Sequence, residues 1–175
     1  YRAHAAEVGA EAPAEPILFL KAPSAMCGPY DDLRLPPGST HTDWEVELAV
    51  VIGRPVRHAT PEQAEAAIAG YTVLNDVSAR DWQFRTSQFL QGKTFEHATP
   101  IGPWMVTPDE VGGTAPDLEL TCTIDDTLRQ QSRTSQLVFG PAAIVAYVSD
   151  VVTLRPGDLV LTGTPGGVGH AMDPP

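Results

Sequence analysis

The chain has 175 residues, of which 42% are hydrophobic, and this composition predicts one globular domain with a substantial core. The formal charge of −11 argues against nucleic-acid binding, because phosphate backbones are bound by clustered Lys and Arg. Two cysteines exclude a disulfide framework and a cysteine-rich zinc site. No apolar run approaches membrane-spanning length and no signal peptide is evident, so we expect a cytoplasmic protein without a membrane partner.

Short apolar runs separated by segments rich in Pro and Gly predict a fold dominated by β-strands. Residues 22–43 are predicted to be loop. The pair Asp125-Asp126 is expected to form the turn of a hairpin. In chain order, the predicted strands are 17–21, 44–53, 71–74, 118–124, 128–131 and 159–161.

Helical signals are fewer. Residues 60–63 form a capping-box signature that opens a helix, which is predicted to continue to residue 69 and to stop at Gly70. Gly140-Pro141 opens a second helix with apolar residues at helical spacing. Residues 1–7 are compatible with a helix, and 78–91 with a broken helix or a loop.

Glu45 and Glu47 stand at the head of the strand 44–53. Residues i and i+2 of a strand point to the same face, so both carboxylates converge, and the apolar neighbours predict a strand covered on both faces. Buried like charges need protonation, a cationic side chain or a metal ion. Asp76, after the strand 71–74, adds a third carboxylate, and three carboxylates without cysteine suit Mg²⁺ or Mn²⁺. Alternatively, the glutamates are edge-strand charges and Asp76 is a turn residue.

Two further groups carry candidate chemistry. His4 and Glu7 are three residues apart, which in a helix gives either a general base held by a carboxylate or an incidental surface pair. Lys21 and Lys93 are the only lysines among 11 basic residues, so each marks a position that favours an amine. Lys93 is predicted to face a substrate carboxylate or developing oxyanion, the alternative being a solvated loop lysine.

The glycine-rich segment 163–169 does not match a nucleotide-binding fingerprint. It is either a tight turn or a loop whose amides and Thr164 hydroxyl contact an anionic substrate. The other histidines show no H-E-x-x-H arrangement and are interpreted as structural; they are His41, His58, His97 and His170.

Several of these residues belong to ordered motifs that together resemble the fumarylacetoacetate hydrolase (FAH) family. The motifs are Tyr1-x-x-His4-x-x-Glu7, Phe19-Leu20-Lys21, Glu45-Val46-Glu47-Leu48, 75–81, Gly92-Lys93-Thr94-Phe95, 100–103 and 161–169. The resemblance implies a mostly β (α+β) fold, the FAH-type β-roll of packed mixed sheets with a few short helices. It also implies Mg²⁺ or Mn²⁺ and usually a homodimer. Relatives extend beyond both ends, so we expect residues 1–175 to be a single catalytic domain lacking its native ends.

Carried over position by position, the resemblance also implies residue roles. His4 and Glu7 would form a water-activating dyad on a mobile N-terminal lid. The implied roles are metal ligation for Glu45, Glu47 and Asp76, catalysis for His4, Glu7 and Lys93, and substrate contact for Gln83, Thr164 and Arg80.

The resemblance, with which these residues are consistent, implies a metal-dependent hydrolase that cleaves a carbon–carbon bond in an acylpyruvate or related β-diketo acid through a metal-bound enolate. One alternative keeps the metal site and changes the reaction to oxaloacetate decarboxylation, or to isomerisation or hydration of a 2-oxo-dienoic acid. Another alternative is a non-catalytic metal-binding family member. Residues 42–44 and 102–104 resemble the diketo-deoxy-sugar-acid branch of the family.

Overall fold

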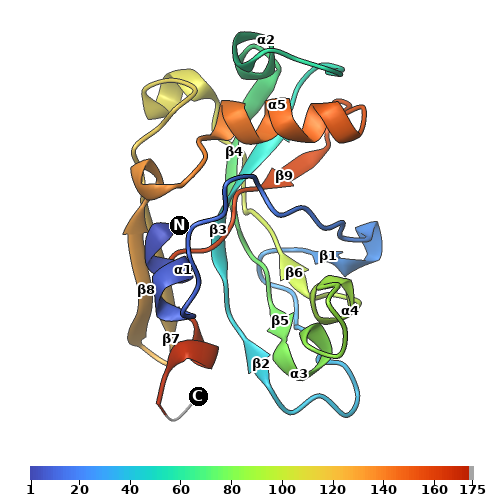
Figure 1. Ribbon diagram of the computed structural model, residues 1–175, viewed down its shortest axis with the longest axis vertical. Coiled ribbons are helices and arrows are strands. Elements are labelled where there is room, and N and C mark those ends of the chain that lie inside the picture. Colours follow the sequence, from blue (N-terminus) through green and yellow to red (C-terminus); the bar gives the residue numbers. More distant parts are fainter. Residues whose placement is uncertain (174–175) are drawn as a thin grey trace.

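A three-stranded antiparallel sheet runs through the centre of the molecule in the order β4-β3-β9 (Figure 1). The computed structural model describes residues 1–173, so Pro174 and Pro175 lie outside the described residues. The strands are β3 (Val46–Ile52), β4 (Ile68–Asn75) and β9 (Leu159–Leu161). Six of the seven β3 residues are buried, which confirms the prediction of a strand covered on both faces.

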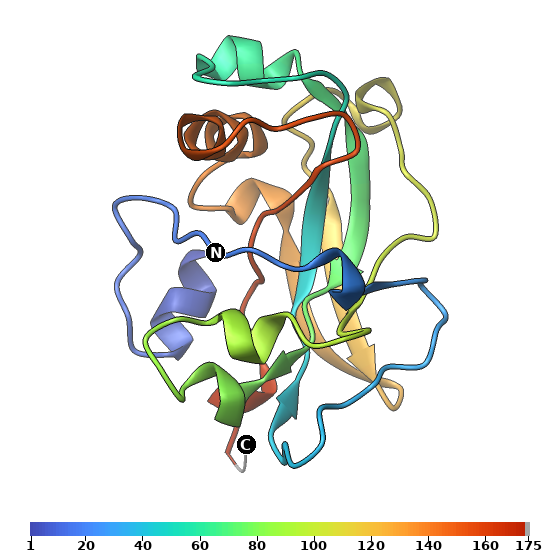
Figure 2. The ribbon, with the colours of Figure 1, turned by 90° about the vertical axis from the view of Figure 1, so that its right-hand side faces the viewer.

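Two helices cover one face of this sheet (Figure 2). They are α2 (Pro61–Glu65), which begins with the predicted capping box, and α5 (Pro141–Val151), which begins with Gly140 as N-cap. Side chains from both helices and the sheet form one hydrophobic core. Its members include Val50, Ile52, Tyr71, Ile144 and Val145.

Smaller sheets surround the central one. A hairpin of β7 (Glu119–Ile124) and β8 (Thr127–Arg133) packs beside β3, and its turn residues Asp125 and Asp126 have φ of 48° and 62°. This left-handed pair is the geometry of a two-residue hairpin turn, as the sequence predicted. The two-residue strands are β1 (Met26–Cys27) parallel to β6 (Thr99–Pro100), and β2 (Thr42–Asp43) antiparallel to β5 (Ser78–Ala79).

The remaining helices are short. The α-helices are α1 (Arg2–Glu7), α3 (Arg80–Gln83) and α4 (Leu90–Lys93). Helix α3 lies within the segment 78–91 that was predicted as a broken helix or a loop, and α4 overlaps its end. No described helix is long and apolar enough to cross a membrane. The 3₁₀ helices are η1 (Pro23–Ala25), η2 (Pro108–Val111), η3 (Thr134–Gln136) and η4 (Gly169–Ala171).

Two predicted elements are wrong. Residues 17–21 form no strand, and Ile17 and Leu20 are 66% and 77% exposed, so this apolar run gains no sheet partner. The helix that opens at residue 61 ends at Glu65 rather than at residue 69, and β4 begins at Ile68. Pairing with β3 decides this boundary, because the Gly53 N–H donates to the Ala67 carbonyl and Ile52 pairs with Ile68.

Candidate active site

Three buried carboxylates meet where β3 begins and β4 ends. Glu45, Glu47 and Asp76 are 5%, 3% and 0% exposed, and one carboxylate oxygen from each lies within 4.8 Å of the others. The main chains of the two strands fix this cluster, because the Asp76 N–H donates to the Glu45 carbonyl at 2.8 Å. The Asn75 side chain accepts the Glu45 N–H at 2.8 Å. The structure therefore brings the three predicted ligands together, and neither glutamate is an exposed edge charge.

Both lysines of the chain point into this cluster. Lys93 Nζ lies 2.6 Å from Glu45 Oε2 and 3.2 Å from Asp76 Oδ2, and the residue is 3% exposed. Lys21 Nζ lies 2.5 Å from Asp76 Oδ1 and also donates to the Lys93 carbonyl. Although burial by itself would lower the pKa of Lys93, Glu45 and Asp76 raise it above its ordinary value. Lys93 is therefore a buried ammonium and not a solvated loop lysine.

Glu47 is the carboxylate without a cationic partner. Its Oε2 accepts the Gly163 N–H at 2.8 Å, and among residues 1–173 no Lys or Arg lies within ion-pair distance of it. Burial, followed by the charges of Asp76 and Glu45, raises the pKa of Glu47 to about 8. Glu45 and Asp76 are paired with Lys93, Lys21 and Arg80, whereas Glu47 has no such partner among the described residues. A divalent cation at the cluster would stabilise the ionised form of Glu47.

Arg80 supports the cluster from the side. Its Nη1 lies 2.7 Å from Glu45 Oε1 and 2.8 Å from Gln83 Oε1, and its Nε donates to Asp43 Oδ2 at 2.8 Å. Asp43 also accepts the main-chain N–H groups of Gly169 and His170. Nε and Nη1 of the guanidinium are therefore occupied by protein partners, and Nη1 helps to orient Glu45. The predicted contact of Arg80 and Gln83 with a substrate stays a prediction.

The His4–Glu7 pair lies on α1 at the edge of the site. His4 Nδ1 is 2.8 Å from Glu7 Oε1, and the other Glu7 oxygen accepts the Gly167 N–H at 2.7 Å. Because the carboxylate accepts the proton of Nδ1, His4 Nε2 is left as the basic nitrogen. The two side chains are 29% and 23% exposed, so water reaches them. The segment 163–169 is therefore more than a turn, because it docks the helix that carries this pair.

Thr164 lies in the same segment but is buried, with 3% exposure. Its hydroxyl donates to the Val46 carbonyl at 3.0 Å and accepts from the Gln130 side chain at 2.8 Å. In this structure the hydroxyl holds the loop against β3. A substrate contact by Thr164 stays a prediction.

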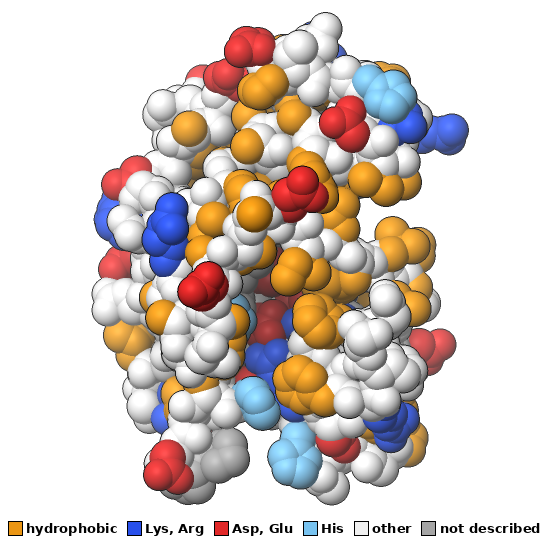
Figure 3. Space-filling view, in the orientation of Figure 1, with side chains coloured by type: hydrophobic (Ala, Val, Ile, Leu, Met, Phe, Trp, Pro, Cys, Tyr) orange, Lys and Arg blue, Asp and Glu red, His pale blue; other side chains and the backbone are white. Residues whose placement is uncertain are grey.

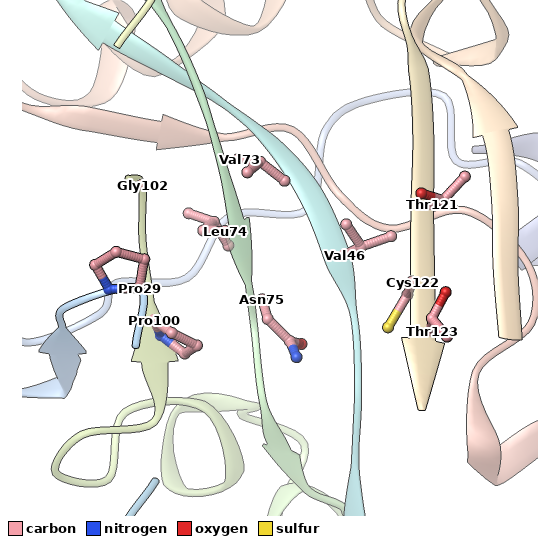
Figure 4. A pocket seen from close by; sticks show the side chains of 10 residues that line it. All are labelled: Pro29, Val46, Val73, Leu74, Asn75, Pro100, Gly102, Thr121, Cys122 and Thr123. Carbon is pink, nitrogen blue, oxygen red and sulfur yellow. The ribbon is translucent and has the colours of Figure 1, made fainter. Parts of the chain in front are cut away.

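Figure 3 shows acidic and basic side chains together at the bottom of a hollow, with histidines along its lower edge. A cavity of about 320 Å³ includes Arg80, Arg129, His41 and His170 in its lining. A second cavity of about 310 Å³ lies between β7 and the β1–β6 pair (Figure 4). None of the ten residues that line this second cavity is charged, and Val46 faces it while its neighbours Glu45 and Glu47 face the cluster. The linings of these two cavities include neither the three carboxylates nor Lys93, and the first cavity reaches the cluster only through Arg80, which contacts Glu45.

Sequence reasoning missed three residues of this arrangement. Asp43, which orients Arg80, and Gln130, which holds Thr164, gave no signal, because each acts on residues far away in the chain. Lys21 did give a signal, since it is one of only two lysines, but its spacing to Asp76 could not be predicted.

The whole chain, residues 1–175, matches the family described as fumarylacetoacetate (FAA) hydrolase, C-terminal. The chain belongs to the fumarylacetoacetate hydrolase family. It is 48% identical over 177 residues to oxaloacetate tautomerase FAHD2B, mitochondrial, of Bos taurus, covering 100% of this chain and 56% of that protein. It is 45% identical over 175 residues to 2,4-didehydro-3-deoxy-L-rhamnonate hydrolase of Sphingomonas sp. (strain SKA58), covering 99% and 61%. The chain thus spans little more than half the length of these relatives.

The fold also matches solved structures of the family. The crystal structure of fumarylpyruvate hydrolase from Pseudomonas aeruginosa in complex with Mn²⁺ and pyruvate superposes with a TM-score of 0.86. The two proteins are 36% identical, and the match covers 96% of this chain and 75% of that one. These comparisons confirm the resemblance drawn from the motifs and the mostly β, α+β fold.

The residues present fit a divalent metal, such as the Mn²⁺ in the structure of fumarylpyruvate hydrolase from Pseudomonas aeruginosa. Among the described residues Glu47 lacks a cationic partner, and buried Asp76 Oδ2 accepts no hydrogen bond, although Lys93 Nζ lies 3.2 Å from it. Three hard oxygen donors with no nearby sulfur are the set that Mg²⁺ and Mn²⁺ prefer.

Proposed function

We propose that this chain is the catalytic domain of a divalent-metal-dependent enzyme that hydrolyses a carbon–carbon bond in an acylpyruvate or related β-diketo acid. The observation that carries the proposal is a buried carboxylate cluster next to a water-accessible His–Glu pair held by the same loop. Glu45, Glu47 and Asp76 would hold Mg²⁺ or Mn²⁺. When bound, the ion would supply Lewis-acid stabilisation of negative charge on the oxygens of a 2-oxo acid.

The chain's own residues supply the remaining chemistry. His4 Nε2 takes a proton from the water that attacks the acyl carbonyl, while Glu7 holds the imidazole and stabilises its charged form. Lys93, which stays protonated, provides positive charge beside the cluster where an oxyanion develops. The bond between the acyl carbon and the pyruvate methylene carbon breaks, its electron pair leaves with the pyruvate part, and that carbon then gains a proton. The products are a carboxylic acid and pyruvate.

The direct test is pyruvate release from acetylpyruvate and fumarylpyruvate by the full-length protein with added Mg²⁺ or Mn²⁺. We expect EDTA to abolish the activity and added metal to restore it. Glu47→Gln should lower the activity at least ~100-fold, because one of the proposed metal ligands is lost. Glu119→Gln is the matched control, because Glu119 is an exposed glutamate on β7. Hydrolysis that is unaffected by EDTA or by Glu47→Gln would contradict the proposal.

A second reaction at the same site is favoured by the 48% identity to an oxaloacetate tautomerase. Tautomerisation or decarboxylation of a 2-oxo acid needs no attacking water, so it does not require the His4–Glu7 pair as a water activator. His4→Ala separates the two reactions, with His58→Ala as control because His58 is paired with Asp150 on the surface. Loss of hydrolysis with retained tautomerisation in His4→Ala would assign the pair to hydrolysis. A wild-type protein that tautomerises oxaloacetate and hydrolyses no acylpyruvate would favour this second reaction.

A further inference from the structure

Gln130 is a buried amide whose polar atoms reach the segments that build the site. It lies on β8 and is 1% exposed, whereas its neighbours Arg129 and Gln131 are exposed. Its Oε1 accepts the Val46 N–H at 2.9 Å. Its Nε2 donates to Thr164 Oγ1 at 2.8 Å and to the Pro165 carbonyl at 3.0 Å. Both halves of the amide are thus used by main-chain or hydroxyl groups outside its own hairpin.

The hydrogen bonds of Gln130 lie where β9 no longer provides main-chain hydrogen-bond partners for β3. Strand β9 pairs with β3 only from Ala49 to Val51, after which the chain turns away through Gly163. The buried main-chain groups of β3 beyond this point still need hydrogen bonds. Gln130 satisfies the Val46 N–H, and Thr164, which Gln130 holds, satisfies the Val46 carbonyl. Val46 is the residue between Glu45 and Glu47. The side chains of Gln130 and Thr164 therefore fix the main chain that separates the two glutamates.

Strand β8, which carries Gln130, also shapes the loop that docks the His4–Glu7 pair. The Arg129 carbonyl lies so close to Gly167 that a Cβ there would clash with it. Gly167 has φ of 99°, and its N–H donates to Glu7. The position of the loop relative to β8 therefore decides where Glu7 is held.

We infer that Gln130 is a positioning residue: it fixes the separation between the carboxylate strand β3 and the 163–169 loop, and so sets both metal affinity and the placement of the His4–Glu7 pair. This inference rests on the proposed function for its kinetic consequences. It does not depend on which 2-oxo acid is the substrate, and its metal-binding consequence can be measured without any substrate.

The test compares Gln130→Leu with Gln131→Leu in the full-length protein. Gln131 is the next residue of β8, is exposed, and makes one surface hydrogen bond to Glu119, so it is a matched control. Titration calorimetry with Mn²⁺ should show affinity lowered at least ~10-fold in Gln130→Leu and within ~2-fold of wild type in Gln131→Leu. Hydrogen exchange of the 163–169 amides should accelerate in Gln130→Leu alone. Unchanged Mn²⁺ affinity and unchanged exchange in a folded Gln130→Leu protein would overturn the inference.

A double-variant cycle separates positioning from a general loss of stability. Because Gln130 holds the Thr164 hydroxyl and both side chains bond the main chain of Val46, the effects of Gln130→Leu and Thr164→Val on Mn²⁺ affinity should be clearly less than additive. Additive effects would show independent structural roles and would overturn the inference. If Gln130→Leu does not fold, Gln130→Glu replaces it, since the carboxylate keeps an acceptor for Val46 but cannot donate to Thr164 or Pro165. A wild-type protein that binds Mn²⁺ yet turns over no 2-oxo acid would remove the proposed function and leave this test intact.

Discussion

Metal binding should release nearly one proton at neutral pH, and Glu47 should be its source. Burial and the charges of Asp76 and Glu45 raise the pKa of Glu47 to about 8. At pH 7 the side chain is therefore protonated in about 90% of metal-free molecules, since one pH unit corresponds to a tenfold ratio of the two forms. A metal ligand must be the deprotonated carboxylate, so binding should release ~0.9 proton at this pH. Apparent affinity should rise about tenfold per pH unit below 8 and level off above it.

Titration calorimetry with Mg²⁺ or Mn²⁺, in buffers of different protonation enthalpy, measures this proton release directly. Glu47→Gln has no proton to release, so its binding should be weaker and show little dependence on buffer. The exposed Glu119→Gln should behave as wild type. Equal affinity at about pH 6 and pH 8, or wild-type proton release that persists in Glu47→Gln, would refute the reasoning.

Three other outcomes follow from the same geometry. The free energy of unfolding of the metal-free protein should fall by a few kcal/mol as pH rises from 4.5 to about 8. In the unfolded chain Glu47 ionises near its ordinary pKa of 4.5, whereas in the folded protein it keeps its proton up to about pH 8. Urea unfolding with and without saturating metal measures this, and a metal-free stability that rises over this window would contradict it. Lys21→Met should lower metal-free stability by ~1–3 kcal/mol, because buried Asp76 loses a charged partner, and an unchanged urea midpoint would refute this. Gly167→Ala should displace the loop and abolish hydrolysis. Gly157→Ala should lower the free energy of unfolding by only ~1–2 kcal/mol, the cost of a left-handed φ of 89°, because open space surrounds Gly157. Equal kcat in the two alanine variants would contradict the role given to the loop.

Local patterns in the sequence determined several features of this protein. Alternation along a strand placed Glu45 and Glu47 on one face, and the structure shows both in one cluster. The capping box at Thr60 and the turn at Asp125-Asp126 were also predicted, because each depends on residues within four positions of one another.

Other features were decided only by tertiary contacts. The apolar run 17–21 satisfies the pattern of a strand but finds no sheet edge, and pairing of Ile68 with Ile52 ends a helix that local propensity would continue. Lys21 reaches Asp76 across 55 positions, and Gln130 reaches Val46 across 84. Strand alternation and helical spacing describe only neighbours in the chain. The sequence therefore identified the carboxylates that are candidate metal ligands, whereas the folded structure alone shows which amines and amides hold them in place.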